Sequence, residues 1–247
     1  MKANVPPASG AADGAVAQGV VAGVYAGRAV SLSHGDTTVR SALVKYALTG
    51  PSYVAVDGLE ADEQADHRHH GGPGKALLVV PAEHYDHGAG PAESLPVGTL
   101  GENLSTRGLL ESQVRIGDVF SIDEVVVRVT QPRRPCFKLG ARHGIPDLAL
   151  GLQRTGQTGF YLAVLRPGML KAGAVMTLIV PTTHGVTLAE VNRIMNVDKT
   201  DLSGIRRVLH AGDDIPVAWR AQLEARLVNP RLVDHDNARM TGEGIAG

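Results

Sequence analysis

From residue 20 to residue 180 the chain alternates short apolar, β-branched segments with turn residues. Gly, Pro, Asp and Asn separate the segments, and each segment has the length of a single β-strand. Strands are predicted at residues 20–32, 41–47, 52–56, 76–80, 114–120, 124–131, 159–166 and 174–180. Helical patterning in this region is limited to residues 81–87 and 146–154. Many short strands with few helices between them predict an all-β barrel or sandwich.

The segment at residues 124–131 is apolar over more consecutive positions than a half-exposed strand allows. Its sequence, EVVVRVTQ, lacks the alternation of apolar and polar residues that one solvent-facing side would impose. We therefore expect a strand that is buried on both faces or that closes a barrel.

The apolar period changes from that of a strand to that of a helix after residue 181. Thr187 and Glu190 have the spacing of a capping box, and they begin a predicted helix at residues 187–196. A second apolar series ends at Gly212, and a third begins after Asp214. Three short helices are marginal in isolation, so we expect them to pack on one another or on the β region.

These patterns predict a mainly β protein in which a barrel or sandwich is followed by a small group of helices. Ala, Gly and Pro dominate the first residues, which contain no continuous apolar segment of the kind found in a secretory signal. A cytoplasmic location is expected on that basis. The predicted parts are a disordered leader at 1–18, a β-barrel domain at 19–181, a three-helix domain at 182–232 and a flexible tail at 233–247.

Composition excludes several classes of protein. A hydrophobic content of 43% is too high for a disordered chain, and no run of about 18 apolar residues could span a bilayer. With 24 basic and 25 acidic residues, the chain has no long-range positive field to recruit nucleic acid. We expect neither a membrane nor a nucleic-acid partner. The single cysteine cannot form an intramolecular disulfide, a CxxC zinc site or a protein-held iron–sulfur cluster.

That cysteine, Cys136, follows a predicted strand and has cationic neighbours at Arg133, Arg134, Lys138 and Arg142. Positive neighbours favour the thiolate over the thiol, which makes the sulfur a candidate metal ligand or nucleophile. Prolines on both sides of the two arginines stiffen the loop. The alternative is a small buried hydrophobic residue, which is the usual role of a lone cysteine.

A glycine-rich segment, HGGPGK at residues 70–75, precedes the predicted strand at 76–80. Its glycines allow backbone N–H groups to approach an anion, and Lys75 adds a positive charge. The spacing is not that of a Walker A loop, because Ala76 stands where the metal-binding hydroxyl would be. A simple tight turn before a strand is the alternative.

Histidines and carboxylates between residues 62 and 87 suggest a zinc or iron site, but their spacing disfavours one. No HExxH motif is present, and adjacent histidines such as His69 and His70 would point to opposite faces of a strand. A nucleophilic Cys136 with His70 as its base is chemically feasible. A hydrolase is nevertheless a minor alternative, since neither a GxSxG elbow nor a papain-like cysteine motif occurs.

Four motifs, taken in order, resemble the MOSC domain, the module related to the C-terminal part of molybdenum cofactor sulfurase. They are GLEADEQADHRHHGGPGKA, PAEHY, LGENLSTRGLLESQVRIGDVF and TQPRRPCFKL. The resemblance extends to the YiiM-like branch of the family, including its small C-terminal three-helix domain. This chain departs from the branch pattern at Ala61, Leu100 and Thr130, where Gly, Phe and Ser are usual.

The resemblance implies a closed β-barrel whose loops hold the molybdenum cofactor, a molybdopterin-bound molybdenum, with Cys136 as the protein ligand to the metal. It also makes Cys136, His70, Asp62 and Asp66 the candidate catalytic residues, the last three as proton donors or as anchors for the site. The candidate cofactor-binding residues are Gly71, Gly72, Lys75, Glu102, Asn103, Arg133, Arg134 and Lys138. A soft thiolate suits a metal already bound by dithiolene sulfurs, and cations suit the phosphate of the pterin.

Relatives in this family reduce N-hydroxylated compounds, and the YiiM-like branch is linked to resistance to hydroxylaminopurine base analogues. The resemblance therefore implies an oxidoreductase acting on N-hydroxylated bases or related small N-hydroxy compounds. Its electrons would come from a separate reductase, because the chain contains no motif for a redox centre of its own. The alternative is a non-catalytic protein that binds the molybdenum cofactor or carries a persulfide sulfur on Cys136.

Overall fold

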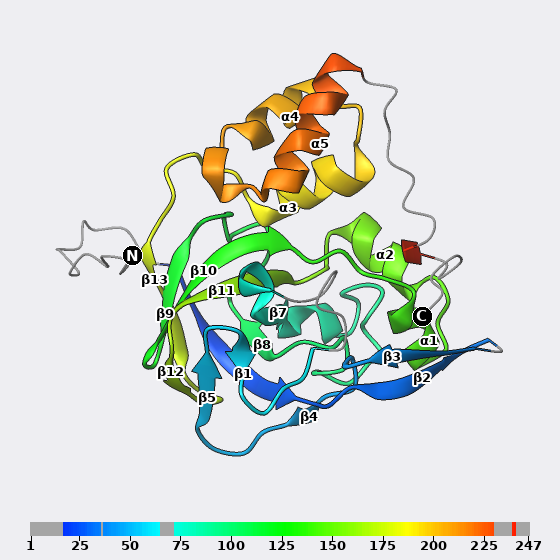
Figure 1. Ribbon diagram of the computed structural model, residues 1–247, viewed down its shortest axis with the longest axis vertical. Helices are drawn as coiled ribbons and strands as arrows, with labels where there is room; N and C mark the ends of the chain where they lie inside the picture. The colour runs from blue at the N-terminus through cyan, green and yellow to red at the C-terminus, as the bar shows by residue number, and fades with distance from the viewer. Residues whose placement is uncertain (1–16, 36, 65–71, 230–238, 241–247) are drawn as a thin grey trace.

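The computed structural model describes residues 17–35, 37–64, 72–229 and 239–240, which form a β-barrel with a group of helices at one end (Figure 1). The predicted leader at 1–18 lies outside the described residues except for its last two positions. The same is true of the predicted tail at 233–247 except for residues 239–240.

Seven strands close the barrel, as the sequence predicts. In order around the barrel they are β1 (Gln18–Ala26), β13 (Val175–Val180), β9 (Val119–Ile122), β10 (Val125–Pro132), β11 (Phe160–Arg166), β7 (Leu77–Pro81) and β8 (Leu104–Arg107). Closure comes from the antiparallel pairing of β1 with β13, in which Gln18 lies opposite Thr177. Neighbouring strands are antiparallel except β7 and β8, which run parallel. A closed barrel has no exposed edge on these strands.

The remaining strands are not part of the closed barrel wall. β4 (Tyr46–Ala47) adds to the end of β1, and β5 (Ser52–Ala55) pairs with both β6 (Gly58–Leu59) and β12 (Gly168–Leu170). A separate hairpin consists of β2 (Val30–His34) and β3 (Thr37–Ser41). The hairpin packs against the helix that follows Cys136, where the rings of His34 and Phe137 lie 4.6 Å apart.

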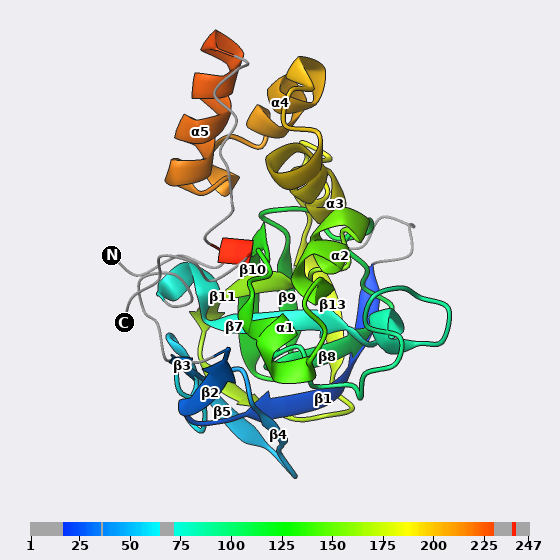
Figure 2. The same cartoon turned by 90° about the vertical axis from the view of Figure 1, so that its right-hand side faces the viewer.

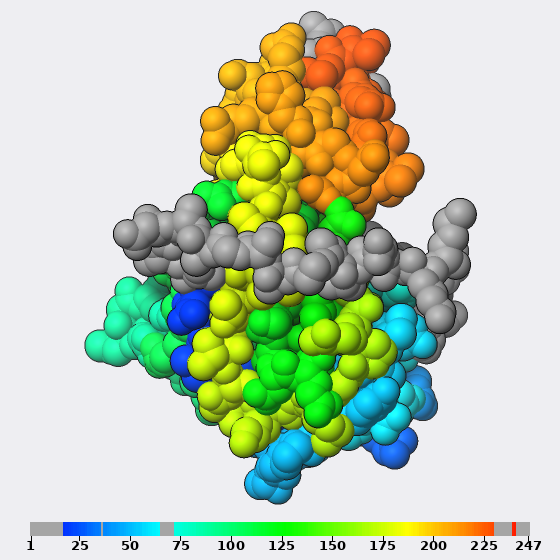
Figure 3. Space-filling view, turned by 90° about the vertical axis from the view of Figure 1, so that its left-hand side faces the viewer, coloured from blue at the N-terminus to red at the C-terminus, as the bar shows by residue number. Residues whose placement is uncertain are grey.

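Helical segments lie along the barrel and beyond its end (Figure 2). Those on the barrel are η1 (Pro73–Lys75), η2 (Ala82–Tyr85), α1 (Lys138–His143) and α2 (Leu148–Thr155). Those of the C-terminal unit are α3 (Leu188–Asn192), its π-helical continuation η3 (Arg193–Val197), α4 (Leu202–Leu209), η4 (Gly212–Asp214) and α5 (Val217–Val228). The space-filling view shows the C-terminal unit standing on the barrel (Figure 3). Among the described residues, no helix combines the length and the apolar composition that a bilayer-spanning segment needs.

One apolar core runs through the barrel into the C-terminal unit. It includes Phe120 and Phe160 inside the barrel and Ile194 and Leu223 among the helices, all fully buried. A second, smaller core joins α1 and α2 to the outer side of β7 and β11, through residues such as Leu139. The first core holds β10 and the second holds α1, so together they fix the elements on either side of the loop that carries Cys136.

Strand β10 is buried on both faces, as its apolar run predicts. Its burial is nearly continuous from Val125 to Pro132, because it lies between β9 and β11 and packs against α3. The capping box is also confirmed: the Thr187 side chain accepts a hydrogen bond from the Glu190 N–H at 3.2 Å, and α3 begins there.

Three of the predicted strands are interrupted in the structure. The one predicted at 41–47 is extended only at its two ends, at Ser41 in β3 and at Tyr46–Ala47 in β4. The predicted strand at 114–120 is a strand only from Val119, because Gly117 adopts a positive φ of 87° in a turn that Asp118 closes by accepting from the Arg115 N–H at 2.9 Å. The predicted strand at 20–32 is broken near Gly27, which lies against the Val44 carbonyl too closely for a side chain.

Candidate functional site

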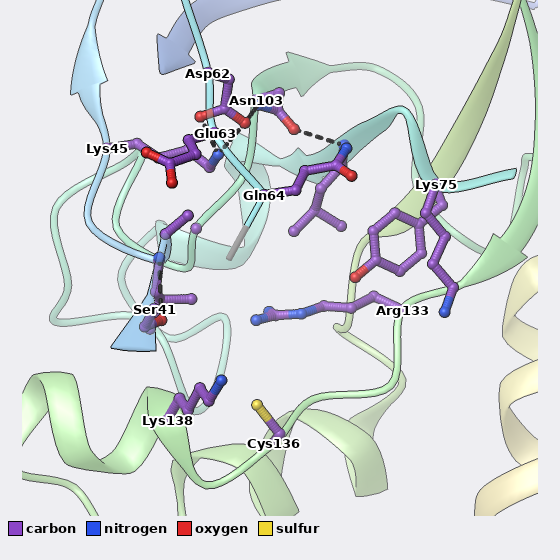
Figure 4. A pocket seen from close by; sticks show the side chains of 15 residues that line it. Ser41, Lys45, Asp62, Glu63, Gln64, Lys75, Asn103, Arg133, Cys136 and Lys138 are labelled. Atoms are coloured by element: carbon purple, nitrogen blue, oxygen red, sulfur yellow. Dashed lines mark hydrogen bonds and ion pairs between the residues drawn. The ribbon is translucent and has the colours of Figure 1, made fainter. Parts of the chain in front are cut away.

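A pocket opens where the loop after β10 faces the segment between β3 and β4 and the loop after β6 (Figure 4). The walls come from parts of the chain that are far apart in sequence. Six of the residues predicted for the site line this pocket: Asp62, Lys75, Asn103, Arg133, Cys136 and Lys138. The barrel therefore brings together side chains from three of the four sequence motifs.

Cys136 lies in the loop between β10 and α1, with its sulfur directed into the pocket (Figure 4). The residue is 7% exposed. Its loop is fixed by backbone hydrogen bonds from the Arg133 N–H to the Gly159 carbonyl at 2.9 Å and from the Leu139 N–H to the Cys136 carbonyl at 3.1 Å. The loop thus holds the thiol at a defined place in the pocket lining.

Arg133 extends its guanidinium into the middle of the pocket (Figure 4). The residue is only 4% exposed, and its Nη1 atom has no hydrogen-bond partner among the described residues. A buried guanidinium N–H without a partner costs free energy that an anionic ligand would recover. This side chain is the clearest sign that the pocket accepts an anion.

Two lysines add positive charge to the same pocket. The Lys138 ammonium donates to the Arg40 carbonyl at 3.2 Å, which places it across from the β2–β3 hairpin. The Lys75 ammonium lies 5.9 Å from the centre of the Tyr161 ring, a cation–π distance. Arg134 does not line the pocket, although the sequence places it beside Arg133.

Asp62 and Lys45 form a buried ion pair at the opposite end of the pocket. Lys45 Nζ lies 2.5 Å from Asp62 Oδ1, and the carboxylate also accepts from the Gly27 N–H at 2.9 Å and from Asn103 Nδ2 at 2.8 Å. Burial lowers the pKa of Lys45, and the attraction of Asp62 opposes that effect only in part. Asp62 is surrounded by hydrogen-bond donors, so the geometry favours the anchoring alternative over proton donation.

Asn103 connects this ion pair to the barrel wall. Its Oδ1 atom accepts from the Leu78 N–H of β7 at 3.0 Å, while its Nδ2 atom donates to Asp62. Glu102 lies behind the wall rather than in the pocket lining, and its Oε1 atom accepts from Tyr85 at 2.5 Å and from the Gly98 N–H at 3.0 Å. Burial, followed by the nearby Glu102, raises the pKa of Tyr85 well above its usual range. Asn103 and Glu102 therefore support the wall from the inside.

The remaining predicted residues contribute little to the described site. His70, Asp66 and Gly71 lie outside the described residues. Gly72 precedes η1 with a positive φ of 93° and is exposed, and it is not part of the pocket lining. Within the described ranges, no group of three or more His, Cys, Asp and Glu side chains is arranged to hold a metal ion. His84, for example, pairs with Glu111 in the interior, 2.9 Å away.

Sequence reasoning missed Lys45 as a pocket residue, and it identified Arg142 only as a cation near Cys136. Lys45 is a lone cation in an apolar segment, ALVKYAL at residues 42–48, and this isolation is the signal that could have identified it. Arg142 donates to the Leu43 carbonyl at 2.5 Å and so fixes the pocket wall opposite α1. Burial lowers the pKa of Arg142.

The pocket combines a buried thiol with a cationic wall, and this donor set fits one class of ligand well. A thiolate binds a soft metal, and the guanidinium with its two neighbouring ammonium groups binds a phosphate. An anionic cofactor that carries a thiophilic metal would satisfy both, and it would also supply the partner that the Arg133 guanidinium lacks among the described side chains.

Sequence comparison finds one matching family model and several related proteins. A family model described as "MOSC domain" matches residues 66–177. The chain is 37% identical over 196 residues to the uncharacterized protein YflK of Bacillus subtilis, covering 79% of this chain and 88% of that protein. It is 35% identical over 215 residues to protein YiiM of Escherichia coli, covering 85% and 94%. A Gibberella moniliformis protein named "Reductase" is 31% identical over 192 residues, which cover 75% of this chain and 34% of that protein.

Solved structures show the same similarity in three dimensions. The structure of YiiM from Escherichia coli has a TM-score of 0.65 and 30% sequence identity, covering 85% of this chain and 96% of that chain. The structure of YiiM from Geobacillus stearothermophilus has a TM-score of 0.68 and 25% identity, covering 85% and 99%. The barrel and the C-terminal helices are therefore shared with these proteins.

Proposed function

Because this chain belongs to the MOSC domain family, we propose that its pocket holds a molybdenum cofactor and that the protein is an oxidoreductase for small N-hydroxylated compounds, N-hydroxylated bases among them. The observation that carries the proposal is the buried thiol of Cys136 in one pocket with the Arg133 guanidinium, whose Nη1 atom has no partner among the described residues. Similarity to a protein named "Reductase" supports redox chemistry.

Each part of the cofactor has candidate ligands in the pocket. Cys136 Sγ would hold the molybdenum, and Arg133, Lys75 and Lys138 would hold the phosphate of the pterin. When bound, the cofactor supplies the two electrons that reduce the N–O bond. The rigid loop between β10 and α1 keeps the sulfur in position, so that binding requires little ordering of the protein.

Reduction of an N-hydroxyl group to an amine consumes two electrons and two protons and releases water. Lys45 holds a proton at Nζ on the pocket wall, and burial lowers the pKa of this ammonium, which favours its release of a proton. Asp62 keeps the Lys45 side chain in place through its buried carboxylate. We assign Lys45 the role of a proton donor to the substrate and Asp62 that of its anchor.

The rest of the pocket wall limits the access of water. Leu78 and Tyr161 supply apolar surface, and Arg142 fixes the backbone at Leu43 on the facing wall. A partly dry pocket strengthens the interaction of charged side chains with an anionic ligand. It also suits a small, flat substrate such as an N-hydroxylated purine, whose rings can lie against apolar side chains.

The experiment is to express the full chain in a host that makes the molybdenum cofactor and to measure the molybdenum and pterin content of the purified protein. Reduction of an N-hydroxylated purine is then assayed with an artificial low-potential electron donor. We expect equimolar molybdenum and pterin together with sustained turnover. Bound cofactor without turnover would instead favour a carrier of the cofactor or of a persulfide sulfur, and absence of molybdenum would contradict the proposal.

A further inference from the structure

After the C-terminal helices, the chain meets the barrel again at Arg239. The Arg239 guanidinium donates to the Pro135 carbonyl through Nη1, and the Arg239 carbonyl accepts from the Phe137 N–H at 3.0 Å. These two partners are the residues immediately before and after Cys136. Arg239 therefore bonds the backbone on both sides of the buried thiol.

Gln153 of α2 holds the other end of this guanidinium. Its Oε1 atom accepts from Arg239 Nη2 at 2.7 Å. The backbone carbonyl of Gln153 accepts from Asn192 Nδ2 of α3 at 3.0 Å. Gln153 and Asn192 are 6% and 1% exposed, so these bonds are shielded from water. A continuous set of hydrogen bonds thus links the C-terminal helical unit to the loop that carries Cys136.

We propose that Arg239 is a positioning residue for Cys136, and that the C-terminal part of the chain, through Arg239 and Gln153, holds the thiol in the orientation that the pocket requires. The contacts that carry this proposal are with the backbone of the loop and with a glutamine side chain on α2. The importance of Arg239 for cofactor binding rests on the proposed function, whereas its effect on the position of the loop is independent of that function.

Hydrogen bonds from outside the loop are important for its position. Pro135 lacks a backbone N–H and cannot donate a hydrogen bond that would fix the loop from within. The backbone bonds from Arg133 and Leu139 end at the Gly159 and Cys136 carbonyls. Arg239 bonds two further backbone groups of the loop, the Pro135 carbonyl and the Phe137 N–H, from the side of Gln153 and α2.

The test compares the cofactor-free forms of wild type, Arg239→Ala, Arg239→Lys and Gln153→Met, with Arg206→Ala as a control on an exposed position of α4. The rate at which iodoacetamide alkylates Cys136 is measured at one fixed pH, well below the unfolding temperature of each variant. Loss of a charge-assisted hydrogen bond should raise local opening of the loop, and with it the alkylation rate, about tenfold or more in Arg239→Ala. Arg239→Lys and Gln153→Met should lie between Arg239→Ala and wild type, and Arg206→Ala should match wild type.

Amide hydrogen exchange provides a second measurement on the same samples. We expect faster exchange at Phe137 in Arg239→Ala, with unchanged exchange at barrel amides such as that of Val127. If Arg239→Ala fails to fold, Arg239→Lys and Gln153→Met still test whether Arg239 positions the loop. Wild-type alkylation and exchange in the Arg239 variants would overturn the inference.

Molybdenum content after expression in a cofactor-competent host separates this inference from the proposed function. We expect a lower molybdenum content in Arg239→Ala than in wild type, with partial rescue in Arg239→Lys. If wild-type protein itself takes up no molybdenum, the proposed function fails, while the alkylation and exchange rates of the cofactor-free protein still decide the role of Arg239.

Discussion

Lys45 and Asp62 form an ion pair on the wall of the pocket, with side chains that are only 6% and 8% exposed. Breaking a buried pair leaves one charge without compensation, and this typically costs about 3 kcal/mol or more of the free energy of unfolding. Asp62 also accepts hydrogen bonds from Gly27 and Asn103, whereas the Lys45 ammonium donates to no side chain but Asp62 among the described residues. Lys45 and Asp62 therefore contribute unequally to the free energy of unfolding.

We expect Asp62→Leu to destabilise the protein more than Lys45→Met does, and the double variant to cost less than the sum of the two single variants. Chemical denaturation of the three variants gives the coupling free energy as a double-mutant cycle. A larger loss for Lys45→Met than for Asp62→Leu would show that Asp62 is not the anchor of this wall.

Replacing Cys136 with Ser should abolish molybdenum retention and turnover while leaving the barrel folded. A hydroxyl is a harder and far weaker ligand than a thiolate for a metal that is bound by sulfur. Metal analysis and thermal unfolding, measured on the same preparation, check the two halves of this expectation. Wild-type molybdenum content with wild-type turnover would mean that the sulfur is not the ligand.

Arg133→Gln should weaken cofactor binding, since a charge-assisted hydrogen bond to phosphate contributes roughly 1.5–3 kcal/mol, or about ten- to a hundredfold in affinity. Lys75→Ala should have a similar effect on binding and change the free energy of unfolding by less than about 0.5 kcal/mol. Occupancy is measured at limiting cofactor for both variants. Arg166→Gln, on the far part of β11, is the matched control and should retain wild-type occupancy.

Stability should fall as the pH is lowered from about 7.5 to 5.5, in part because of His143. Burial lowers the pKa of His143 below its usual value, and its Nε2 atom lies 2.8 Å from the Thr99 carbonyl. The folded state then binds fewer protons than the unfolded state in this range, so its contribution is present above the unfolded pKa of about 6.5 and is lost as the pH falls through the folded value.

His143→Gln retains a donor for the Thr99 carbonyl but does not titrate. The variant should therefore show a smaller loss of unfolding free energy between the two pH values than wild type shows. Denaturant titrations at both pH values measure the difference, and equal losses in the two proteins would exclude His143 as a contributor.

The purified protein should not sustain turnover from NADH or NADPH alone. The chain has one cysteine, no CxxCH haem attachment and no GxGxxG motif that follows a strand into a helix, so it offers no centre to pass electrons from a nicotinamide to molybdenum. Reduction of an N-hydroxylated purine is compared with nicotinamide alone, with an artificial low-potential donor and with an added reductase. Only the last two should support turnover, and steady consumption of NADH by the chain alone would contradict the need for a partner.

Much of the barrel was predictable because its strands carry their signal locally. The apolar run at residues 124–131 and the capping box at Thr187 both depend on neighbouring residues, and both are confirmed. Strand β8 was missed because Gly101, Glu102 and Asn103 precede it and indicate a turn, whereas it is formed by parallel pairing with β7. Such pairing depends on a strand that is distant along the chain, which a local pattern does not report.

The residues of the pocket also divide into those that the local sequence indicates and those that depend on distant contacts. The cluster around Cys136 and the motifs at Lys75 and Asn103 were visible in the sequence, and the fold brings them together. The contributions of Lys45 and Arg239 were not visible, because each acts through a partner remote in the chain: Asp62 for one, and the backbone beside Cys136 for the other. Side chains of this kind are identified by tertiary contacts rather than by spacing.

The pairing of β1 with β13 also determines when the barrel can close during synthesis of the chain. Gln18 emerges from the ribosome early, yet its partner Thr177 follows only after most of the chain has been made. Until then one edge of β1 is open, and two nascent chains on one messenger could join at that edge. The Cys136 loop emerges before β13, and Arg239 emerges after it, so the contacts around the thiol are complete only after Arg239 has been synthesised. Under the proposed function, cofactor insertion would follow synthesis of the segment that contains Arg239, and slow release of that segment would lengthen the period in which the chain is prone to aggregate.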